Sequence, residues 1–526
     1  MRRSGFAPAL IITALLATVL VVTIQFSNQE SAPETSLAPS KTTSSLTLRI
    51  GIAELGEFNI LDPAKTTSMS AVIPVWQMYD RLVDIAPGGE LLPMLATHWY
   101  SSEGLTRWHF EIRKGVKFNR ADRRDVTPED VRASIERAVQ APAFGRSMLA
   151  DIVVGIQPFL NGEADHISGI QVEENEVVFT LRRPFAFLPG RIAASFFSIV
   201  PADTPAKSNA PPAGSGAYQL VEWDRSAGRV VLEKVARDWG ISNSAPSKLI
   251  FHSFNSASTG ALELEADTLD WLQGPSTLID LLGDVSTVKL QTPPNTKLGV
   301  VAFNMNNPVF KGEHGRTLSQ ALNLALDRIA LANIIGGGTP AIGPIPNGRW
   351  AKYGVAEDRK KARTLIEKLS SNYRHLTLLI YPATEERLIA EGVARQWREV
   401  GIEITFKQGQ ADFWDRVIGG NYQAAVGSYA PFVDKPEQYI WLYQQATQPV
   451  PNVMRFSSEA FDSAYQAYTE AENVADQDLH LAAALDALAE QPPMAWLIQP
   501  PRVTASKVEL QVPYVAGLPQ FYQASE

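Results

Sequence analysis

The sequence predicts a mixed α/β protein, because segments with strand-like alternation and segments with helical periodicity follow one another along the chain. The clearest unit is residues 376–406, which reads as a short strand, a helix from Thr384 and a second strand at 402–406. Gly401 ends the helix. Strand, helix and strand of these lengths predict a β-α-β crossover, and therefore a parallel pair of strands.

The other elements fit the same class. Residues 46–52 alternate apolar and polar side chains, which predicts a strand. A helix is predicted after Thr127, which can cap it, because Pro128 suits the first helical position. A second helix is predicted over 318–335, ending at Gly336.

The composition excludes several classes of function. The 526 residues suggest two to four domains, and the 45% of apolar residues can form sizeable cores. The absence of cysteine excludes disulfides, Cys-ligated zinc, iron–sulfur clusters and a thiol nucleophile. The 47 Lys and Arg against 56 Asp and Glu give a net charge of −9, which argues against nucleic acid as the main partner.

The N-terminal segment predicts export. Arg2 and Arg3 precede an uncharged apolar run that ends near Phe26. Residues 1–26 are therefore predicted to be either a cleaved signal peptide or an uncleaved membrane anchor, and both interpretations place the rest of the chain outside the cytoplasm. Residues 27–45 are rich in Ser, Thr, Pro and Ala and are predicted to form a disordered linker.

The search for catalytic motifs finds none, so we expect no enzyme, no metal site and no cofactor. The seven histidines are never three or four residues apart, which excludes a helical metal-binding pair. Ser286 and Lys289 match Ser-x-x-Lys, but the segment alternates like a strand rather than beginning a helix. The remaining candidate is a run of mixed charge that we interpret as a solvated loop: Arg120, Asp122, Arg123, Arg124 and Asp125.

Several short motifs follow one another along the chain. They are Leu61-Asp62-Pro63-Ala64, Tyr79-Asp80-Arg81-Leu82-Val83, residues 92–99, 108–118 and 127–131, Gly214-Ser215-Gly216-Ala217-Tyr218 with Trp223, Phe303-Asn304-Met305-Asn306, and residues 320–328. Each motif alone is weak, but the ordered set extends from about residue 46 to the end of the chain. Taken in order, these motifs resemble the peptide/nickel class, family 5, of the extracytoplasmic solute-binding proteins that serve ABC importers.

The resemblance implies a two-lobed periplasmic binding protein fold of type II, cluster C, with an extra domain inserted in the first lobe. The two lobes are expected to close on a ligand by hinge motion. The implied boundaries are 46–82, 201–294 and 497–526 for lobe I, 83–200 for its inserted domain, and 295–496 for lobe II.

The resemblance also implies a function. The protein would capture a peptide or peptide-like ligand and deliver it to the permease of an ABC importer. We expect a periplasmic monomer, with anchoring to the outer face of the inner membrane if residues 1–26 are retained, and no nucleic acid partner. Two alternatives stay open: a membrane-anchored ligand sensor or accessory protein that is not coupled to import, and a hydrolase on the same scaffold.

The ligand-binding residues carry over in part. In peptide-binding members the segment after Leu-Asp-Pro lines the pocket, here Thr67, Ser68 and Met69. A strand of lobe II pairs with the ligand backbone, here Gly427, Ser428, Tyr429 and Ala430.

The resemblance fails at the position after this strand. Peptide binders have an Asp there that holds the α-amino group of the peptide, and this sequence has Pro431. The anchor is missing unless Asp434 takes its place. We therefore hypothesise a ligand without a free α-amino group, or a modified peptide.

Two further positions carry alternatives. Arg416 aligns with a position that can hold a ligand carboxylate, and it can equally be a surface helix residue beside Asp412 and Asp415. The aromatic residues nearby can form apolar walls of the pocket or pack the core: Trp414, Tyr429 and Phe432.

Overall fold

The computed structural model describes residues 46–66, 68–141, 144–205, 208, 210–410, 412–431 and 433–525. The predicted signal or anchor and the linker lie outside these residues, as do Thr67 and Phe432. Within the described residues no helix is long and apolar enough to cross a membrane.

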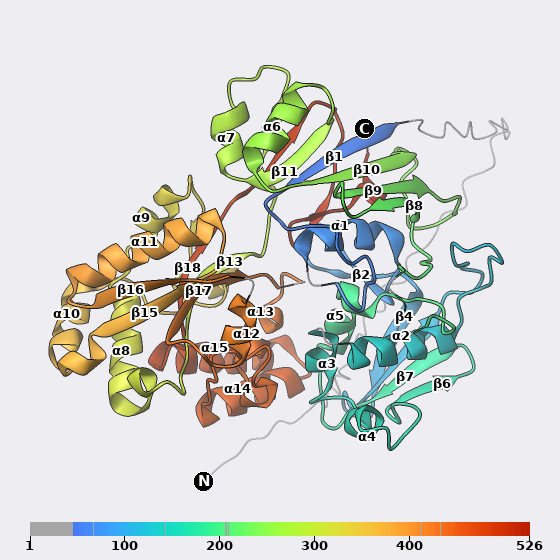
Figure 1. Ribbon diagram of the computed structural model, residues 1–526. Helices are drawn as coiled ribbons and strands as arrows, with labels where there is room; N and C mark the ends of the chain where they lie inside the picture. Colours follow the sequence, from blue (N-terminus) through green and yellow to red (C-terminus); the bar gives the residue numbers. More distant parts are fainter. Residues whose placement is uncertain are drawn as a thin grey trace, which may run out of the picture. The chain divides into compact units, whose positions relative to one another are not determined.

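The first sheet, here sheet I, has seven strands in the order β12-β19-β11-β1-β10-β9-β8. Figure 1 shows β11, β1, β10, β9 and β8 of this sheet side by side. The strand predicted at 46–52 is β1, which pairs in parallel with both β10 and β11. The bounds are β1 (Thr47–Ala53), β8 (Tyr218–Asp224), β9 (Arg229–Lys234), β10 (Lys248–Phe254), β11 (Trp271–Pro275), β12 (Lys289–Gln291) and β19 (Arg502–Ser506). Helices α1 (Met69–Met78), α6 (Ala257–Glu265) and α7 (Thr277–Leu282) accompany this sheet.

The second sheet, sheet II, has six strands in the order β14-β18-β13-β17-β15-β16. The predicted β-α-β crossover is confirmed: β15, helix α11 and β16 follow one another, and β15 is parallel to both β16 and β17. The bounds are β13 (Leu298–Phe303), β14 (Thr339–Pro340), β15 (His375–Ile380), α11 (Thr384–Glu399), β16 (Glu403–Gln408), β17 (Ala424–Tyr429) and β18 (Met494–Gln499).

The chain passes between the two sheets twice, from β12 to β13 and from β18 to β19. The two crossings are bonded to each other, since Asn295 Nδ2 donates to the Pro500 carbonyl oxygen at 3.2 Å. The Gln499 side chain donates in turn to the Asn295 carbonyl oxygen. This is where a hinge between the sheets would lie.

Residues 83–200 form a separate set of elements. A four-stranded antiparallel sheet has the order β4-β5-β7-β6, beside the hairpin β2–β3. The bounds are β2 (Val83–Ile85), β3 (Leu91–Pro93), β4 (Ala96–Ser102), β5 (Arg107–Ile112), β6 (Ile170–Glu173), β7 (Glu176–Thr180), α2 (Pro128–Gln140), α3 (Phe144–Leu149), α4 (Ile156–Leu160) and α5 (Leu188–Ile192).

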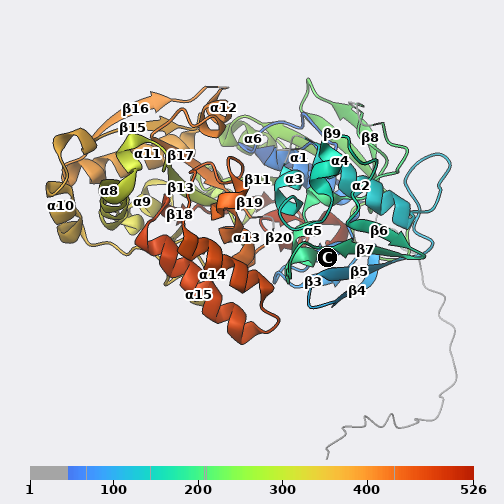
Figure 2. The same cartoon turned by 90° about the horizontal axis from the view of Figure 1, so that it is seen from below.

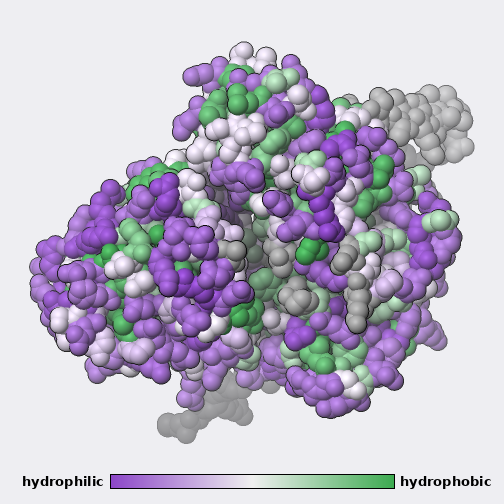
Figure 3. Space-filling view, in the orientation of Figure 1, coloured by the Kyte–Doolittle hydropathy of each residue, from purple (hydrophilic) through white to green (hydrophobic). Residues whose placement is uncertain are grey.

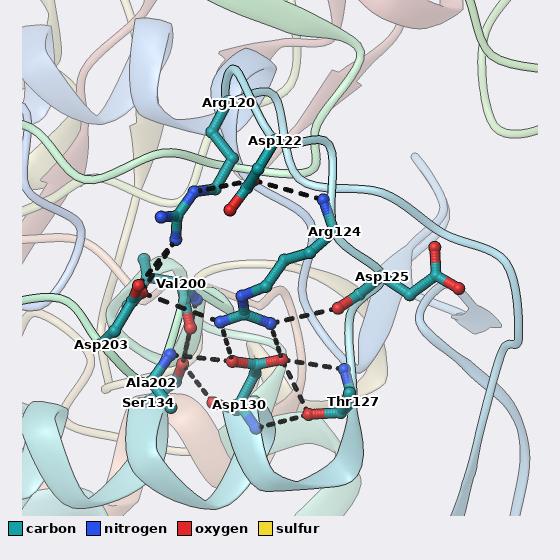
Figure 4. A network of polar contacts seen from close by, with 10 residues as sticks. All are labelled: Arg120, Asp122, Arg124, Asp125, Thr127, Asp130, Ser134, Val200, Ala202 and Asp203. Carbon is teal, nitrogen blue, oxygen red and sulfur yellow. Dashed lines mark hydrogen bonds and ion pairs between the residues drawn. The ribbon is translucent and has the colours of Figure 1, made fainter.

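Helix α2 begins as predicted, with a capping box between Thr127 and Asp130. Arg124 adds a bidentate pair to the Asp130 carboxylate at 2.7 and 2.9 Å, and the Ala202 amide donates to it at 2.8 Å (Figure 4). Burial raises the pKa of Asp130, but the hydrogen bonds from Arg124, Ala202 and Thr127 outweigh burial, and the pKa lies below its usual value. Arg120 pairs with Asp203, so this charged loop fixes the start of α2 against residues 202–203.

Two predictions of secondary structure are wrong. The helix predicted over 318–335 is two helices, α8 (Gly312–Leu324) and α9 (Arg328–Ile334), because Asp327 leaves the helical path and caps α9 by accepting from the Ala330 amide. Ser286 lies in a turn before β12 rather than in a strand.

The remaining helices belong to the second half of the chain. They are α10 (Arg359–Glu367), α12 (Phe413–Ile418), α13 (Pro436–Ile440), α14 (Glu459–Glu470) and α15 (Val474–Glu490), followed by the short strands β20 (Tyr514–Val515) and β21 (Leu518–Pro519). Helices α14 and α15 pack side by side as a hairpin (Figure 2). The cores bury large side chains such as Trp76, Trp397 and Trp496.

Candidate functional site

The carboxyl ends of three parallel strands meet at one edge of sheet II. In register, Ile380 of β15 lies opposite Gln408 of β16 and Val426 of β17. The segments that follow these strands therefore lie together, and α11 and α12 begin there. Ligands of α/β sheets bind outside the carboxyl ends of the strands.

The predicted ligand-pairing segment, Gly427 to Ala430, is the end of β17 and the residue after it. On one side Gly427, Ser428 and Tyr429 pair with β13. On the other side the pairing with β15 stops at Val426, and no strand of the described chain continues it. One backbone edge of this half-buried segment is therefore open to an added strand.

The Ser428 side chain is already engaged in a hydrogen bond within the protein. Its hydroxyl donates to the Glu386 carboxylate at 3.2 Å, and Glu386 is buried. The Lys297 ammonium lies 3.4 Å from Glu386 and also pairs with Glu385. Both Glu residues lie in the first turn of α11, where the helix dipole favours negative charge.

Arg502, at the start of β19 in sheet I, brings a positive charge near these carboxylates. Burial lowers the pKa of Arg502, and Glu385, Glu386 and Glu54 act in the opposite direction. Arg502 and Lys297 lie beside the two crossings between the sheets. The charged group consists of Glu54, Lys297, the Glu385–Glu386 pair and Arg502, which come from four separate segments of the chain. It was not predicted from the sequence for this reason, since the only local signal was the Glu385–Glu386 pair at a helix start.

Trp414 and Arg416 lie on α12, directly after the carboxyl end of β16. Trp414 is 48% exposed and lies against Tyr381, with ring centroids 6.2 Å apart, so it is not a core residue. Arg416 is half-buried, and no described carboxylate lies within ion-pair distance of it, Asp412 and Asp415 included.

Tyr429 fits the alternative of core packing. Its hydroxyl lies 3.5 Å from both the Pro344 carbonyl oxygen and the Tyr443 hydroxyl. Burial raises the pKa of Tyr429 well above its usual value, so the phenol stays neutral. The side chain is directed into lobe II, and only the backbone of Tyr429 belongs to the open edge.

Pro431 and Asp434 occupy the region of the missing amino-group anchor. Pro431 is buried, and its carbonyl oxygen accepts from the Thr296 hydroxyl at 2.7 Å. Asp434 is exposed and accepts from the Tyr439 hydroxyl at 2.9 Å. A Cβ at Gly89 would lie 3.3 Å from the Asp434 carbonyl oxygen, so Asp434 lies where lobe II meets the β2–β3 turn.

Ser68 and Met69 lie at the carboxyl end of β1 in sheet I. The Ser68 hydroxyl lies 2.6 Å from that of Ser70 and donates to the carbonyl oxygen of Leu55, which follows β1. Met69 begins α1 and is half-buried. The predicted site residues thus divide between the strand ends of the two sheets, and the surface is hollowed between the part over α11 and the part over α1 (Figure 3).

Comparison with known proteins gives the family. The model of bacterial extracellular solute-binding proteins, family 5 Middle, matches residues 90–450. The di/tripeptide-binding protein 3 of Pseudomonas aeruginosa is 24% identical over 451 residues, covering 79% of this chain and 82% of its own. The periplasmic murein peptide-binding protein MppA of Escherichia coli is 24% identical over 477 residues, covering 84% and 85%.

Solved structures show the same fold. The periplasmic binding protein DppA from Helicobacter pylori, in complex with the peptide STSA, aligns with a TM-score of 0.76 at 19% identity, covering 91% of this chain and 97% of its own. NikZ from Campylobacter jejuni, in complex with Ni(L-His), aligns with a TM-score of 0.72 at 16% identity, covering 91% and 99%. The predicted two-lobed fold is confirmed, and the chain belongs to the bacterial extracellular solute-binding proteins of family 5.

Proposed function

We propose that this protein captures a peptide or peptide-like ligand between its two lobes outside the cytoplasm and hands it to the permease of an ABC importer, acting as a binding protein without catalysis. The observation that carries the proposal is the open backbone edge of residues 427–429 at the carboxyl ends of β15 and β17. An extended peptide can pair with this edge through its main chain, whatever its side chains are. The relatives named as peptide-binding proteins support the same ligand class.

The side chains around the open edge of residues 427–429 determine which chemical groups the two ends of the ligand can carry. Arg416 offers an unpaired guanidinium to a carboxylate, and Trp414 offers an exposed aromatic wall. Pro431 offers neither a carboxylate nor an amide hydrogen to an ammonium group. We therefore propose a ligand with an acidic end and no free α-amino group, or a modified peptide. A hydrogen bond to a charged group contributes about 1.5–3 kcal/mol, so its loss is a real penalty for ordinary peptides.

Asp434 is the alternative anchor. Its carboxylate already accepts from the Tyr439 hydroxyl, and burial together with this carboxylate raises the pKa of Tyr439, which keeps the donor proton in place. An ammonium group would have to share Asp434 with this phenol. The Ser68–Met69 segment of lobe I is proposed to cover the ligand from the opposite side.

Native mass spectrometry of gently purified protein is the first test, because a ligand retained in the cleft identifies its own class by mass. Calorimetric titration then compares matched peptides with free and acetylated N-termini. We expect acetylated peptides to bind at least as tightly as free ones. Micromolar binding of ordinary di- to pentapeptides, lost on acetylation, would overturn the proposed ligand chemistry and would point to Asp434.

A further inference from the structure

A buried ion pair joins the inserted domain to lobe II. Arg191 of α5 and Glu437 of α13 are 0% and 1% exposed. The Arg191 guanidinium donates to one Glu437 carboxylate oxygen through Nη2 at 2.8 Å and through Nε at 3.1 Å. The Tyr465 hydroxyl of α14 donates to the same oxygen at 2.6 Å. Figures 1 and 2 both place α5 beside α13.

The Nη1 group of Arg191 has partners inside the inserted domain itself. Its Nη1 donates to the Met148 carbonyl oxygen at 2.6 Å and lies 3.6 Å from the Asp151 carboxylate. The guanidinium carbon lies 5.3 Å from the centre of the Trp441 ring. Arg191 and Glu437 are therefore fully partnered only while the inserted domain and lobe II are in contact.

A second set of contacts surrounds the pair. The Ala186 amide donates to the Thr469 carbonyl oxygen at 2.8 Å, and Arg183 donates to the Thr469 hydroxyl at 3.1 Å. The rings of Phe187 and Tyr468 have centroids 4.8 Å apart. The contact thus joins residues 183–191 to residues 437–469 through charge, backbone and aromatic groups together.

This contact is separate from the two chain crossings at Asn295 and Pro500. Because α5 lies in the inserted domain and α13 in lobe II, a rotation about the crossings that moves lobe II away from the inserted domain would separate the two helices. Separation would hydrate both charges. A buried ion pair gains little over its hydrated groups, so it can open without a large penalty. Removal of Glu437 instead leaves the buried Arg191 with only the longer contact to Asp151, and removal of Arg191 leaves Glu437 as a buried charge without its cationic partner in the closed form.

We propose that Arg191 and Glu437 form a latch, meaning a contact that holds the inserted domain against lobe II in the closed arrangement and is released when the lobes separate. The bonds of the latch form only in one relative position of α5 and α13, so the latch specifies the geometry of the closed arrangement. This inference depends on the two-lobed fold and on no particular ligand.

The test measures the distance between the inserted domain and lobe II in the full chain. Asp165 and Ala475 are exposed residues on either side, and the sequence has no cysteine, so Asp165→Cys and Ala475→Cys place spin labels at these two sites alone. Pulsed electron paramagnetic resonance then gives the distribution of distances between the two spin labels. We expect Glu437→Gln to raise the ratio of long to short distances at least about tenfold.

Control variants distinguish a specific latch from a general loss of structure. Arg132→Gln removes an ion pair with Glu129 that lies wholly inside the inserted domain, and it should leave the distribution unchanged. The double variant Arg191→Met/Glu437→Leu removes both charges, and it should restore much of the short distance. Circular dichroism confirms folding. If Glu437→Gln fails to fold, Arg183→Gln, which loses the bond to Thr469, replaces it and should shift the same distances.

The latch would be overturned by a distribution that stays unchanged in the folded Glu437→Gln protein, or in Arg183→Gln where the former does not fold. It would also be overturned if Arg132→Gln shifted the distances equally. Neither result concerns ligand affinity, so failure of the latch and failure of the proposed peptide function are distinguished.

Discussion

Trp414 allows the proposed ligand site to be tested quantitatively. Its side chain is 48% exposed at the carboxyl end of β16. A buried Trp covers up to about 250 Å², so about 120 Å² remains for a ligand to cover. At about 25 cal/mol per Å² this area corresponds to an upper limit of about 3 kcal/mol. If the ligand covers half of it, Trp414→Ala weakens binding by about 1.5 kcal/mol, or about tenfold in Kd.

The assay is calorimetric titration with the ligand that native mass spectrometry identifies. Tyr100→Ala is the matched control, because Tyr100 is 44% exposed on β4 of the inserted domain. Both substitutions should change the melting temperature little, since exposed side chains contribute little to stability. A Kd for Trp414→Ala within twofold of the unmodified protein, with unchanged melting, would refute the placement of the ligand beside α12.

Three further predictions follow from named contacts. Arg416→Gln should raise the Kd of a ligand with a free carboxylate about tenfold and leave its amide unaffected, as measured by paired titrations. Asp434→Asn should leave the Kd of N-acetylated peptides within about twofold, and a selective loss of free-amino peptides would identify Asp434 as the anchor. Asp130→Asn should lower stability by about 2 kcal/mol at neutral pH in urea unfolding, because it weakens the Arg124 pair and the helix cap. The folded-state pKa of Asp130 lies below its unfolded value of about 3.9, so this contribution is present above that pH and is lost as the pH falls through the folded pKa. The stabilities of the two proteins should therefore converge as the pH is lowered below the folded-state pKa.

The helices and strands that were predicted correctly are those whose formation depends on residues close together in the chain. The alternation in 376–381 and the helical stripe after Thr384 are both properties of short windows, and β15, α11 and β16 formed accordingly. The prediction over 318–335 failed for a related reason. Apolar residues continue through Ala325 and Leu326, and this periodicity hid the break that Asp327 makes when it caps α9.

The site was less predictable because its parts meet only in the folded chain. Ser428 was selected as a ligand residue, and its position at the end of β17 follows from the resemblance, but its bond to Glu386 joins residues 42 apart. The latch joins Arg191 to Glu437 across 246 residues. Hydrophobic periodicity carries no information on which charged residues meet, so such pairs emerge only from the structure.

The open strand edge and the lost anchor together constrain what this protein can discriminate. The proposed main-chain pairing along Gly427–Tyr429 would be nearly the same for every extended peptide, so it would contribute affinity but no specificity. Specificity is a difference between affinities, and it must therefore come from the groups at the two ends of the ligand. With Pro431 in place of a carboxylate, the amino end contributes little discrimination in favour of free peptides. In the proposed arrangement, selection would fall on Arg416 and Trp414. We therefore expect a protein that recognises the acidic end of its ligand and tolerates a blocked or modified opposite end.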